Sequence, residues 1–405
     1  MKNNETLKKT NVSFIISGIP PGESGTGRLV SLLTDDIKLL SQRKIRLVFK
    51  PEKPAYWRIK LLFREKKIFK VFDLALHYFV RIFQFWLIIV RIWLNRDARI
   101  MLLHPQNLGY RLSIRLMESR RIPPVLYLLD SSFFCISSYN HVKRENRPCL
   151  RCIDYGFSQI KDNGCTPFPK MDWSATKFVS LLKKNVNLRK VRIVAQNIRQ
   201  AELAQRHFVL SDPPQVIGLW TKDWNELFLE GSTFANTVMK EEYVWDVLFH
   251  GHGLEAKGLN WLVEVARYCP MLKFMFPVSK PVWIESTDNC IFLPCTWESG
   301  LREEISRSKF VAVPSLWSAP IEGSLVKSLV FANAVVVIDN KTSYCDELPE
   351  DIVLKLSEDP IKGASELLIA HKNGWAPDPH KREEWLKSFS SYKIKFIKSL
   401  IDCLG

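Results

Sequence analysis

The chain has 405 residues, of which 46% are hydrophobic and 25% are charged. This composition excludes an intrinsically disordered chain, and the length allows two domains, because a single hydrophobic core stops growing at about 250 to 300 residues. The formal charge of +16 indicates an anionic partner, which could be nucleic acid, a phosphorylated substrate or a membrane surface.

The first predicted unit is a strand over 11–18, a proline-containing loop and a helix that starts near Arg28. The apolar run is short and has no small-residue cleavage site, so we expect no signal peptide and a cytoplasmic protein. In the loop GIPPGESGTGRLV, the residues Gly25, Thr26 and Gly27 precede the helix, where backbone N–H groups favour an anion or a polar ligand. The loop lacks the Lys-Ser/Thr of a Walker A motif and the third glycine of a dinucleotide fingerprint, so it can equally be a structural turn.

The next feature is a basic, aromatic segment over 58–96, with nine basic and two acidic residues among Phe, Trp, Leu and Ile. Its longest charge-free run has nine residues, whereas a spanning helix needs about 20. We therefore predict a helix that lies in the headgroup region of a membrane, with basic residues facing anionic lipid. The alternative is a core helix of the first domain with extended basic side chains.

Four further apolar runs, KIRLVFK, ARIMLLH, PVLYLLD and VRIVAQ, alternate with helical patterns. This alternation predicts a parallel sheet covered on both faces. His104 and Asp130 directly follow two of these runs and should therefore lie at the carboxyl edge of the sheet. In either case the alternative is that the side chain only caps the next helix or loop.

Cysteines cluster between Asp130 and Pro169 with the spacing C-x13-C-x2-C-x12-C. The four residues are Cys135, Cys149, Cys152 and Cys165. One C-x2-C pair with further cysteines at loop distance can supply a tetrahedral thiolate site for structural zinc, with His141 as a substitute ligand. The alternatives are four unrelated reduced thiols or an iron–sulfur cluster. The chain has nine cysteines in all, an odd number that fits a reducing compartment.

A second series of strands and helices begins with YVWDVLFHG and continues through LKFMFPV, CIFLPC, FVAVPS and AVVVID. We predict an N-terminal domain over 1–222, a linker over 223–241, a C-terminal domain over 242–385 and an amphipathic helix over 386–405. The fold class is α/β, with two Rossmann-like domains.

The chain resembles the GT-B type glycosyltransferases, specifically glycosyltransferase family 4. Four pieces carry the resemblance, in family order: SGIPPGESGTGRLVSLL, VLYLLD with Asp130, GHGLEAKG, and VPSLWSAPIEGSLVKSL. The resemblance implies two domains facing a cleft, with a UDP- or GDP-linked sugar held by the second and the acceptor by the first. It also implies a last helix that packs back across both domains, retention of anomeric configuration and no catalytic metal.

The resemblance also implies roles for individual residues. Lys257 matches the family lysine that contacts the diphosphate, and Glu322 is the best candidate for binding the transferred sugar. Asp130 is expected to position the acceptor or act as general base, so the catalytic candidates are Asp130, Glu322 and Lys257. The expected donor site comprises Gly251, His252, Lys257, Glu322, Gly323, Ser324 and Lys327, and the acceptor side comprises Gly25, Thr26, Gly27, His104 and Asp130.

The sequence departs from the family pattern at three positions. The family has two glutamates eight positions apart, where this chain has Ala319 and Lys327. Lys327 cannot accept hydrogen bonds from a ribose, although it can add positive charge near the phosphates. His252 stands where the family usually has arginine.

Two functional hypotheses follow. The first is a glycosyltransferase at the cytoplasmic membrane face, which adds a sugar to a lipid-linked or polysaccharide acceptor such as lipopolysaccharide. The second is a catalytically inactive GT-B scaffold. Nucleic-acid binding is disfavoured, because the basic residues cluster with large aliphatics and no reader motif is present.

Overall fold

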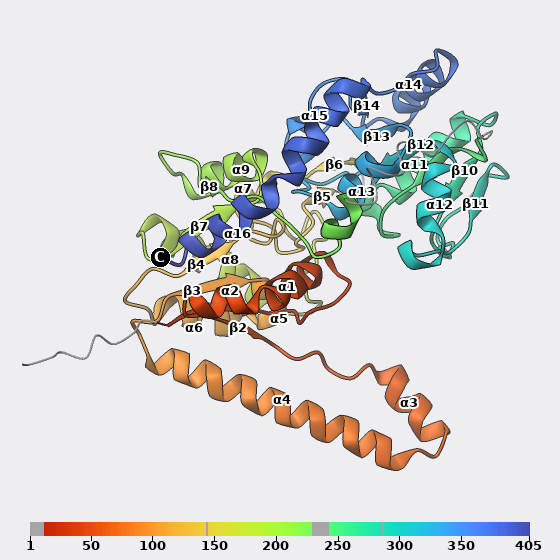
Figure 1. The fold of residues 1–405 in the computed structure, drawn as a ribbon. Helices are drawn as coiled ribbons and strands as arrows, with labels where there is room; N and C mark the ends of the chain where they lie inside the picture. The colour runs from red at the N-terminus through yellow and green to blue at the C-terminus, as the bar shows by residue number, and fades with distance from the viewer. Residues whose placement is uncertain (1–11, 143–144, 229–242, 286) are drawn as a thin grey trace, which may run out of the picture. The chain divides into compact units, whose positions relative to one another are not determined.

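The computed structural model describes residues 12–142, 145–228, 243–285 and 287–405 (Figure 1). The chain forms two compact units. Unit 1 comprises residues 1–129, 172–194 and 398–405, and unit 2 comprises residues 130–171 and 195–397. The predicted linker over 223–241 falls largely on residues 229–241, which lie outside the described residues. The cysteine-rich stretch, which lies inside the predicted N-terminal domain, groups with unit 2.

The first sheet has six strands in the order β2-β1-β3-β4-β7-β8. The pairs from β2 through β7 are parallel, as predicted. The strands are β1 (Ser13–Ser17), β2 (Ile45–Phe49), β3 (Ile100–Leu103), β4 (Val125–Tyr127), β7 (Arg192–Ala195) and β8 (Gln215–Val216). The helices between them are α1 (Gly25–Asp35), α2 (Ile37–Gln42), α5 (Pro105–Leu108), α6 (Tyr110–Glu118), α8 (Ser174–Asn187) and α9 (Ile198–Phe208).

The second sheet lies wholly in unit 2 and has the order β11-β10-β9-β12-β13-β14, with all pairs parallel. The strands are β9 (Trp245–Phe249), β10 (Phe274–Phe276), β11 (Cys290–Phe292), β12 (Ser308–Val313), β13 (Val335–Ile338) and β14 (Leu354–Leu356). The helices are η1 (Glu255–Lys257), α11 (Leu259–Tyr268), η2 (Trp297–Ser299), α12 (Leu301–Ser306), α13 (Gly323–Phe331), η3 (Tyr344–Glu347) and α14 (Pro360–Lys372). Branched and aromatic side chains such as Val247, Phe274 and Phe310 fill the core around this sheet, as a parallel sheet with two covered faces requires.

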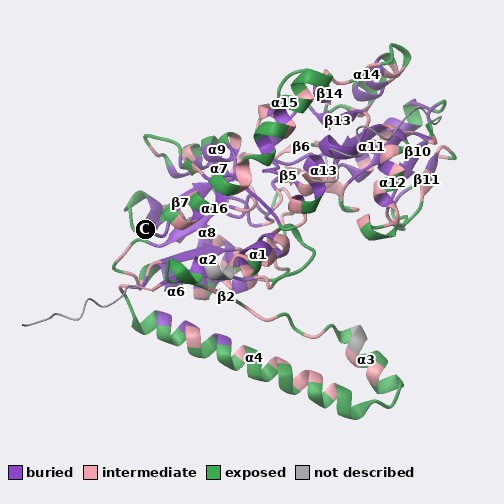
Figure 2. Ribbon diagram, viewed as in Figure 1, coloured by how far each residue is buried: buried purple, intermediate pink, exposed green. Residues whose placement is uncertain are grey.

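The basic, aromatic segment forms two helices in unit 1, α3 (Tyr56–Arg64) and α4 (Ile68–Leu94). Among the described residues, α4 is the one helix whose length and composition would allow it to cross a membrane. Only Phe85, Ile89 and Ile92 of its 27 residues are buried, and Figure 2 shows most of α4 as exposed. The alternative reading of this segment as an ordinary core helix is therefore wrong.

One arginine fixes the carboxyl end of α4. Arg120 donates hydrogen bonds to the carbonyl oxygens of Ile92 and Asn95, both at 2.7 Å, and of Trp93 at 3.1 Å. These are terminal carbonyls that lack partners inside the helix, so the guanidinium satisfies them and balances the negative end of the helix dipole. Burial, followed by the charge of Arg96, lowers the pKa of Arg120.

The predicted C-terminal helix corresponds to the end of α15 (Pro379–Ser390) and to α16 (Tyr392–Asp402). Helix α16 begins in unit 2, and its last turn belongs to unit 1. Within unit 1, Arg99 and Arg192 donate hydrogen bonds to the carbonyl oxygens of Leu404 and Cys403, at 3.0 and 2.9 Å. The chain therefore returns to its first unit at its last residues.

Candidate active site

The candidate site of unit 2 lies at the point where the strand order of the second sheet reverses. Strands β9 and β12 are neighbours there, with Phe249 paired to Ala312, and the chain leaves them in opposite directions along the sheet. In open α/β sheets this crevice beyond the carboxyl ends of the strands is the usual ligand site. Lys257 follows β9, and Glu322 follows β12.

The two loops that leave these strands pack closely. Gly258 has a φ of 78°, and a Cβ atom there would lie 2.0 Å from the carbonyl oxygen of Pro314. The backbone N–H of Leu316 donates to the carbonyl oxygen of Ala256 at 3.0 Å. The glycine of the Lys257-Gly258 pair is therefore required by this close approach as well as by its left-handed conformation.

Lys257 and Glu322 form a salt bridge and hydrogen bond, and their side chains are only 12% and 7% exposed. Ser315 Oγ donates to the other carboxylate oxygen of Glu322 at 2.6 Å. The Lys257 ammonium also lies 4.8 Å from the centre of the Trp317 ring and 5.5 Å from that of Tyr139. A cation enclosed by one carboxylate and two aromatic rings is well suited to exchange that carboxylate for a ligand anion.

Tyr139 and Asp130 both lie in the segment that packs near this pair. Burial raises the pKa of Tyr139, the charge of Lys257 lowers it, and the negative charges of Asp130 and Glu322 raise it. One oxygen of Asp130 accepts a hydrogen bond from the backbone N–H of Ser132 at 2.8 Å, which is the capping role expected of a strand-end carboxylate. The structure thus brings Lys257 and Glu322 together beside Tyr139, and the role of Asp130 in the reaction remains a prediction.

The segment that carries Tyr139 is bonded to the loop after β12. Asn140 Nδ2 donates to Ser318 Oγ at 2.8 Å, and Asn140 Oδ1 accepts from the backbone N–H of Ser318 at 3.0 Å. The rings of Tyr139 and Trp317 are also in edge contact, with centroids 4.6 Å apart. Sequence reasoning missed Tyr139 and Asn140, because an asparagine in a turn-rich loop carries no signal of a partner 178 residues away.

A second group of buried polar side chains includes two residues of α13 itself. Lys327 pairs with Asp223 at 2.9 Å, and its ammonium lies 4.4 Å from the Trp297 ring. A ring nitrogen of His250 lies 2.9 Å from Ser328 Oγ, and the His250 ring stacks on Trp297. The charge of Lys327 is therefore balanced within the protein, a point that the sequence did not indicate.

The remaining predicted donor residues lie on the same two loops. Gly251 directly follows β9, and His252 is exposed in the next position. Gly323 and Ser324 form the first turn of α13, where Glu322 is the N-cap residue but makes no side-chain capping bond. Their N–H groups belong to the helix end that attracts anions.

The four cysteines line one cavity of about 1200 Å³, which is also lined by Gly253–Ala256 before Lys257. Their loop contains β5 (His141–Val142), β6 (Arg147–Pro148) and α7 (Arg151–Asp154). All four are free thiols. Burial, followed by the neighbouring Cys149 and Cys165, raises the pKa of Cys152 to about 12. No three His, Cys, Asp or Glu side chains in the described part of the chain converge closely enough to hold a metal ion. The zinc site stays a prediction from the sequence.

The acceptor-side candidates of unit 1 lie at the reversal point of the first sheet, where Ser17 of β1 pairs with Leu103 of β3. Gly25, Thr26 and Gly27 form the first turn of α1, capped by Ser24 Oγ, which accepts from Gly27 N at 3.0 Å. His104 is the N-cap residue of α5, and its Nδ1 accepts from Asn107 N at 3.4 Å. The structure therefore shows the capping role for His104, and an acceptor role remains a prediction.

Several solved structures share this fold. The sucrose-phosphate synthase of Thermosynechococcus elongatus aligns with a TM-score of 0.58 at 12% identity, over 96% of this chain and 97% of its own. HepE of Anabaena, in complex with UDP and glucose, aligns with a TM-score of 0.52 at 11% identity, over 96% and 99%. OtsA, in its apo structure, aligns with a TM-score of 0.54 at 10% identity, over 97% and 99%.

These likenesses span nearly the whole of each chain. They confirm the predicted α/β fold with two Rossmann-like domains, which is the GT-B fold. A scan against protein-family profiles finds no match, and neither does a search of curated proteins. The comparisons thus define the architecture, and the reaction must be argued from the site.

Proposed function

We propose that the protein is a retaining glycosyltransferase, of the family 4 type, that takes its sugar from a UDP- or GDP-linked donor. The observation that carries this proposal is the buried Lys257–Glu322 pair at the reversal point of the second sheet. It supplies a cation and a carboxylate at the place where such sheets bind nucleotides. The structure of HepE with UDP and glucose supports the choice of donor class.

Glycosyl transfer from such a donor requires stabilisation of a departing diphosphate and of an oxocarbenium-like sugar. In this proposal the Lys257 ammonium exchanges Glu322 for the diphosphate, and the N–H groups of Gly323 and Ser324 bind the same anion. The released Glu322 carboxylate then accepts hydrogen bonds from the sugar hydroxyls. A protonated His252 adds positive charge at the rim, whereas the charge of Lys327 is already balanced by Asp223. In this proposal protein groups meet the charge of the leaving group without a catalytic metal.

We place the acceptor in unit 1 and assign it to the lipid-linked or polysaccharide class. Helix α4 supports this assignment, because its exposed aromatic side chains and neighbouring basic residues match the composition of a helix bound at a membrane surface. In this proposal the protein is peripheral at the cytoplasmic membrane face, and nucleic acid is not a partner.

Thermal unfolding with nucleotide sugars tests the donor assignment. A UDP- or GDP-sugar at 100 times its dissociation constant should stabilise the protein by about 2.7 kcal/mol, and Lys257→Met should abolish the shift. Lys273→Ala is the matched control, because it removes another lysine of unit 2 that lies over an aromatic ring, that of Trp245. If a folded wild-type sample shows no shift with any nucleotide sugar, the scaffold hypothesis is favoured.

A further inference from the structure

A groove of about 790 Å³ runs along α4 in unit 1, which is within the size range of small-molecule sites. One wall is a stripe on α4 at helical spacing, with Leu74, Tyr78, Phe85 and Ile88 as its apolar members. The opposite wall is the end of β2 and the loops beside it. Its apolar members include Pro20, Pro21, Leu47, Val48 and Phe49.

The groove is apolar in its walls and basic at its rim. Its charged lining residues are Lys53 and Arg81, which are cationic, and Glu52, which is anionic; His77 and Gln84 add polar groups. Two cations against one carboxylate leave this rim with a net positive charge, so it is suited to a phosphate.

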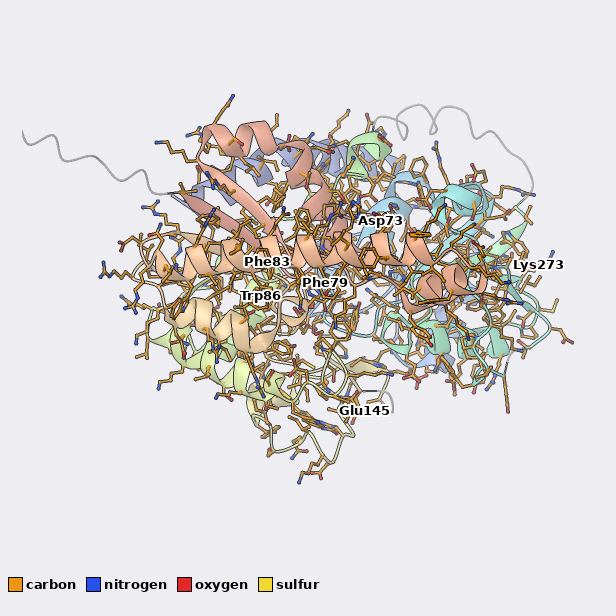
Figure 3. The ribbon with its side chains drawn as sticks, turned by 90° about the horizontal axis from the view of Figure 1, so that it is seen from below. Asp73, Phe79, Phe83, Trp86, Glu145 and Lys273 are labelled. Carbon is orange, nitrogen blue, oxygen red and sulfur yellow. The ribbon has the colours of Figure 1, made fainter. Side chains whose placement is uncertain are left out.

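The groove and the exposed face of α4 lie on opposite sides of the helix. Large apolar side chains recur every three or four residues on the exposed side and are between 46% and 69% exposed: Phe72, Leu76, Phe79, Phe83, Trp86, Val90 and Trp93. Figure 3 shows Phe79, Phe83 and Trp86 along this helix. A helix bound at a bilayer by that stripe would hold the groove beside the headgroups, with the hydrocarbon region within reach.

Part of the groove wall comes from the loop that follows β1. Pro20 and Pro21 line the groove and stand between β1 and the first turn of α1, in the same loop as the predicted acceptor residues Gly25 and Gly27. Gly18 fixes this loop, because a Cβ atom there would lie 2.3 Å from the carbonyl oxygen of His104. A ligand in the groove therefore contacts both α4 and the loop that precedes α1.

We infer that the groove binds the lipid phosphate of the acceptor, with Lys53 and Arg81 on the phosphate and the first part of its single hydrocarbon chain against Leu74, Tyr78 and Phe85. The head of this lipid would carry the acceptor sugar toward the loop at Gly25. The inference rests on the proposed glycosyl transfer and names the acceptor class.

Calorimetric titration with farnesyl phosphate tests the groove. Wild-type protein should bind it at least tenfold more tightly than farnesol or inorganic phosphate, because each of these lacks one half of the interaction. The double variant Lys53→Gln/Arg81→Gln should lose at least tenfold in affinity. Lys60→Gln/Arg64→Gln is the matched control, because it removes two cations of α3 outside the groove and should change the affinity less than twofold.

Equal binding of farnesyl phosphate by wild type and Lys53→Gln/Arg81→Gln, or no binding by wild type, would overturn the inference.

Liposome flotation distinguishes binding in the groove from general attraction to anionic lipid. At equal surface charge, wild type should prefer vesicles that contain polyprenyl phosphate to vesicles that contain phosphatidylglycerol, and the double variant should lose this preference. A wild-type protein without such a preference would also overturn the inference. The nucleotide-sugar shift, which depends on unit 2, should be intact in the double variant. If nucleotide sugar raises the melting temperature but farnesyl phosphate does not bind, only this inference is overturned. If farnesyl phosphate binds but no nucleotide sugar raises the melting temperature, the proposed function is overturned, and the acceptor role of the groove with it.

Discussion

The side-chain amide of Asn140 bonds to both the hydroxyl group and the backbone N–H of Ser318, so a loop from the first half of the chain holds the loop that follows β12. The same amide nitrogen donates to the carbonyl oxygen of Cys149 at 3.2 Å, and Ser131 Oγ donates to the amide oxygen at 2.8 Å. Asn140 is fully buried, so each of these bonds is made away from water. One asparagine that carries no charge therefore contributes several of the hydrogen bonds that hold the candidate donor loop.

Replacing Asn140 with alanine should destabilise the protein and weaken donor binding. Buried hydrogen-bonding groups of Ser318 and Ser131 would lose a partner, and each such loss costs about 1 to 3 kcal/mol. Chemical denaturation should report a lower unfolding free energy, and nucleotide-sugar titration a dissociation constant raised at least tenfold. Asn373→Ala, at the C-cap of α14, is the control and should leave the dissociation constant unchanged. Unchanged donor affinity in Asn140→Ala would show that Asn140 does not position the loop.

The buried pair of Lys257 and Glu322 should behave as a unit. Lys257→Met leaves a carboxylate buried without its cation, which costs about 3 to 5 kcal/mol. Lys257→Met/Glu322→Gln removes both charges and should regain much of that stability, while still failing to bind nucleotide sugar. Denaturant titration of the single variants and the double variant gives the coupling energy. Additive effects would mean that the two side chains do not interact in solution.

The exposed face of α4 should bind anionic vesicles. We expect wild-type protein to float with vesicles that contain phosphatidylglycerol, and to float less as salt is raised, because surface charges are screened. Phe79→Ser/Phe83→Ser/Trp86→Ser should abolish flotation, because three inserted aromatic groups are lost. The control is Leu188→Ser, because Leu188 is an exposed leucine elsewhere in unit 1. Phe85→Ser is not suitable, because Phe85 is buried. Flotation of the triple variant equal to that of wild type would exclude this face as the membrane contact.

The cysteine loop makes a prediction about pH. In the metal-free protein the pKa of Cys152 is raised to about 12, so this thiol stays protonated at pH 9 while the protein is folded. In the unfolded chain a cysteine has a pKa near 8.5 and is mostly thiolate at the same pH. Iodoacetamide should therefore label it slowly until the protein unfolds. Because the folded pKa exceeds the unfolded one, the contribution of Cys152 to stability falls as pH rises above about 8.5.

The zinc prediction is tested on the same sample. Four thiolates around a metal would leave purified protein with about one equivalent of zinc, and a chelator would then lower its melting temperature. Elemental analysis that finds less than about half an equivalent of zinc or iron would contradict a metal site. Cys269→Ala is the control for the loss of a buried thiol outside the loop, because Cys269 lies in the core of unit 2.

Much of the fold could be predicted from the sequence, because buried parallel strands are short apolar runs and their carboxyl ends are marked by glycine, proline and polar residues. That pattern placed Lys257 and Glu322 after two strands, and in the structure they follow β9 and β12, while their roles in donor binding stay predictions. It could not show that the two residues pair with each other, because the neighbour relation of β9 and β12 is set by tertiary packing. Asp223 and Trp297, which enclose Lys327, are likewise brought to it only by the fold.

The pattern was also insufficient for α4. Its sequence is apolar on more than one face, and periodicity alone does not reveal which face a neighbour covers. The structure settles this point by burying Phe85, Ile89 and Ile92 and leaving Phe79 and Phe83 exposed. The β5–β6 hairpin in the cysteine loop was missed because two-residue strands leave no periodicity to detect.

The anchoring of α4 at one end has a practical consequence for handling the protein. Arg120 and the three buried residues hold its carboxyl-terminal half, whereas no residue from Ile68 through Gln84 is buried. In water, two copies can hide these aromatic faces only by packing them against each other. Purified protein without lipid or detergent should therefore self-associate with increasing concentration, and mild detergent should restore the monomer.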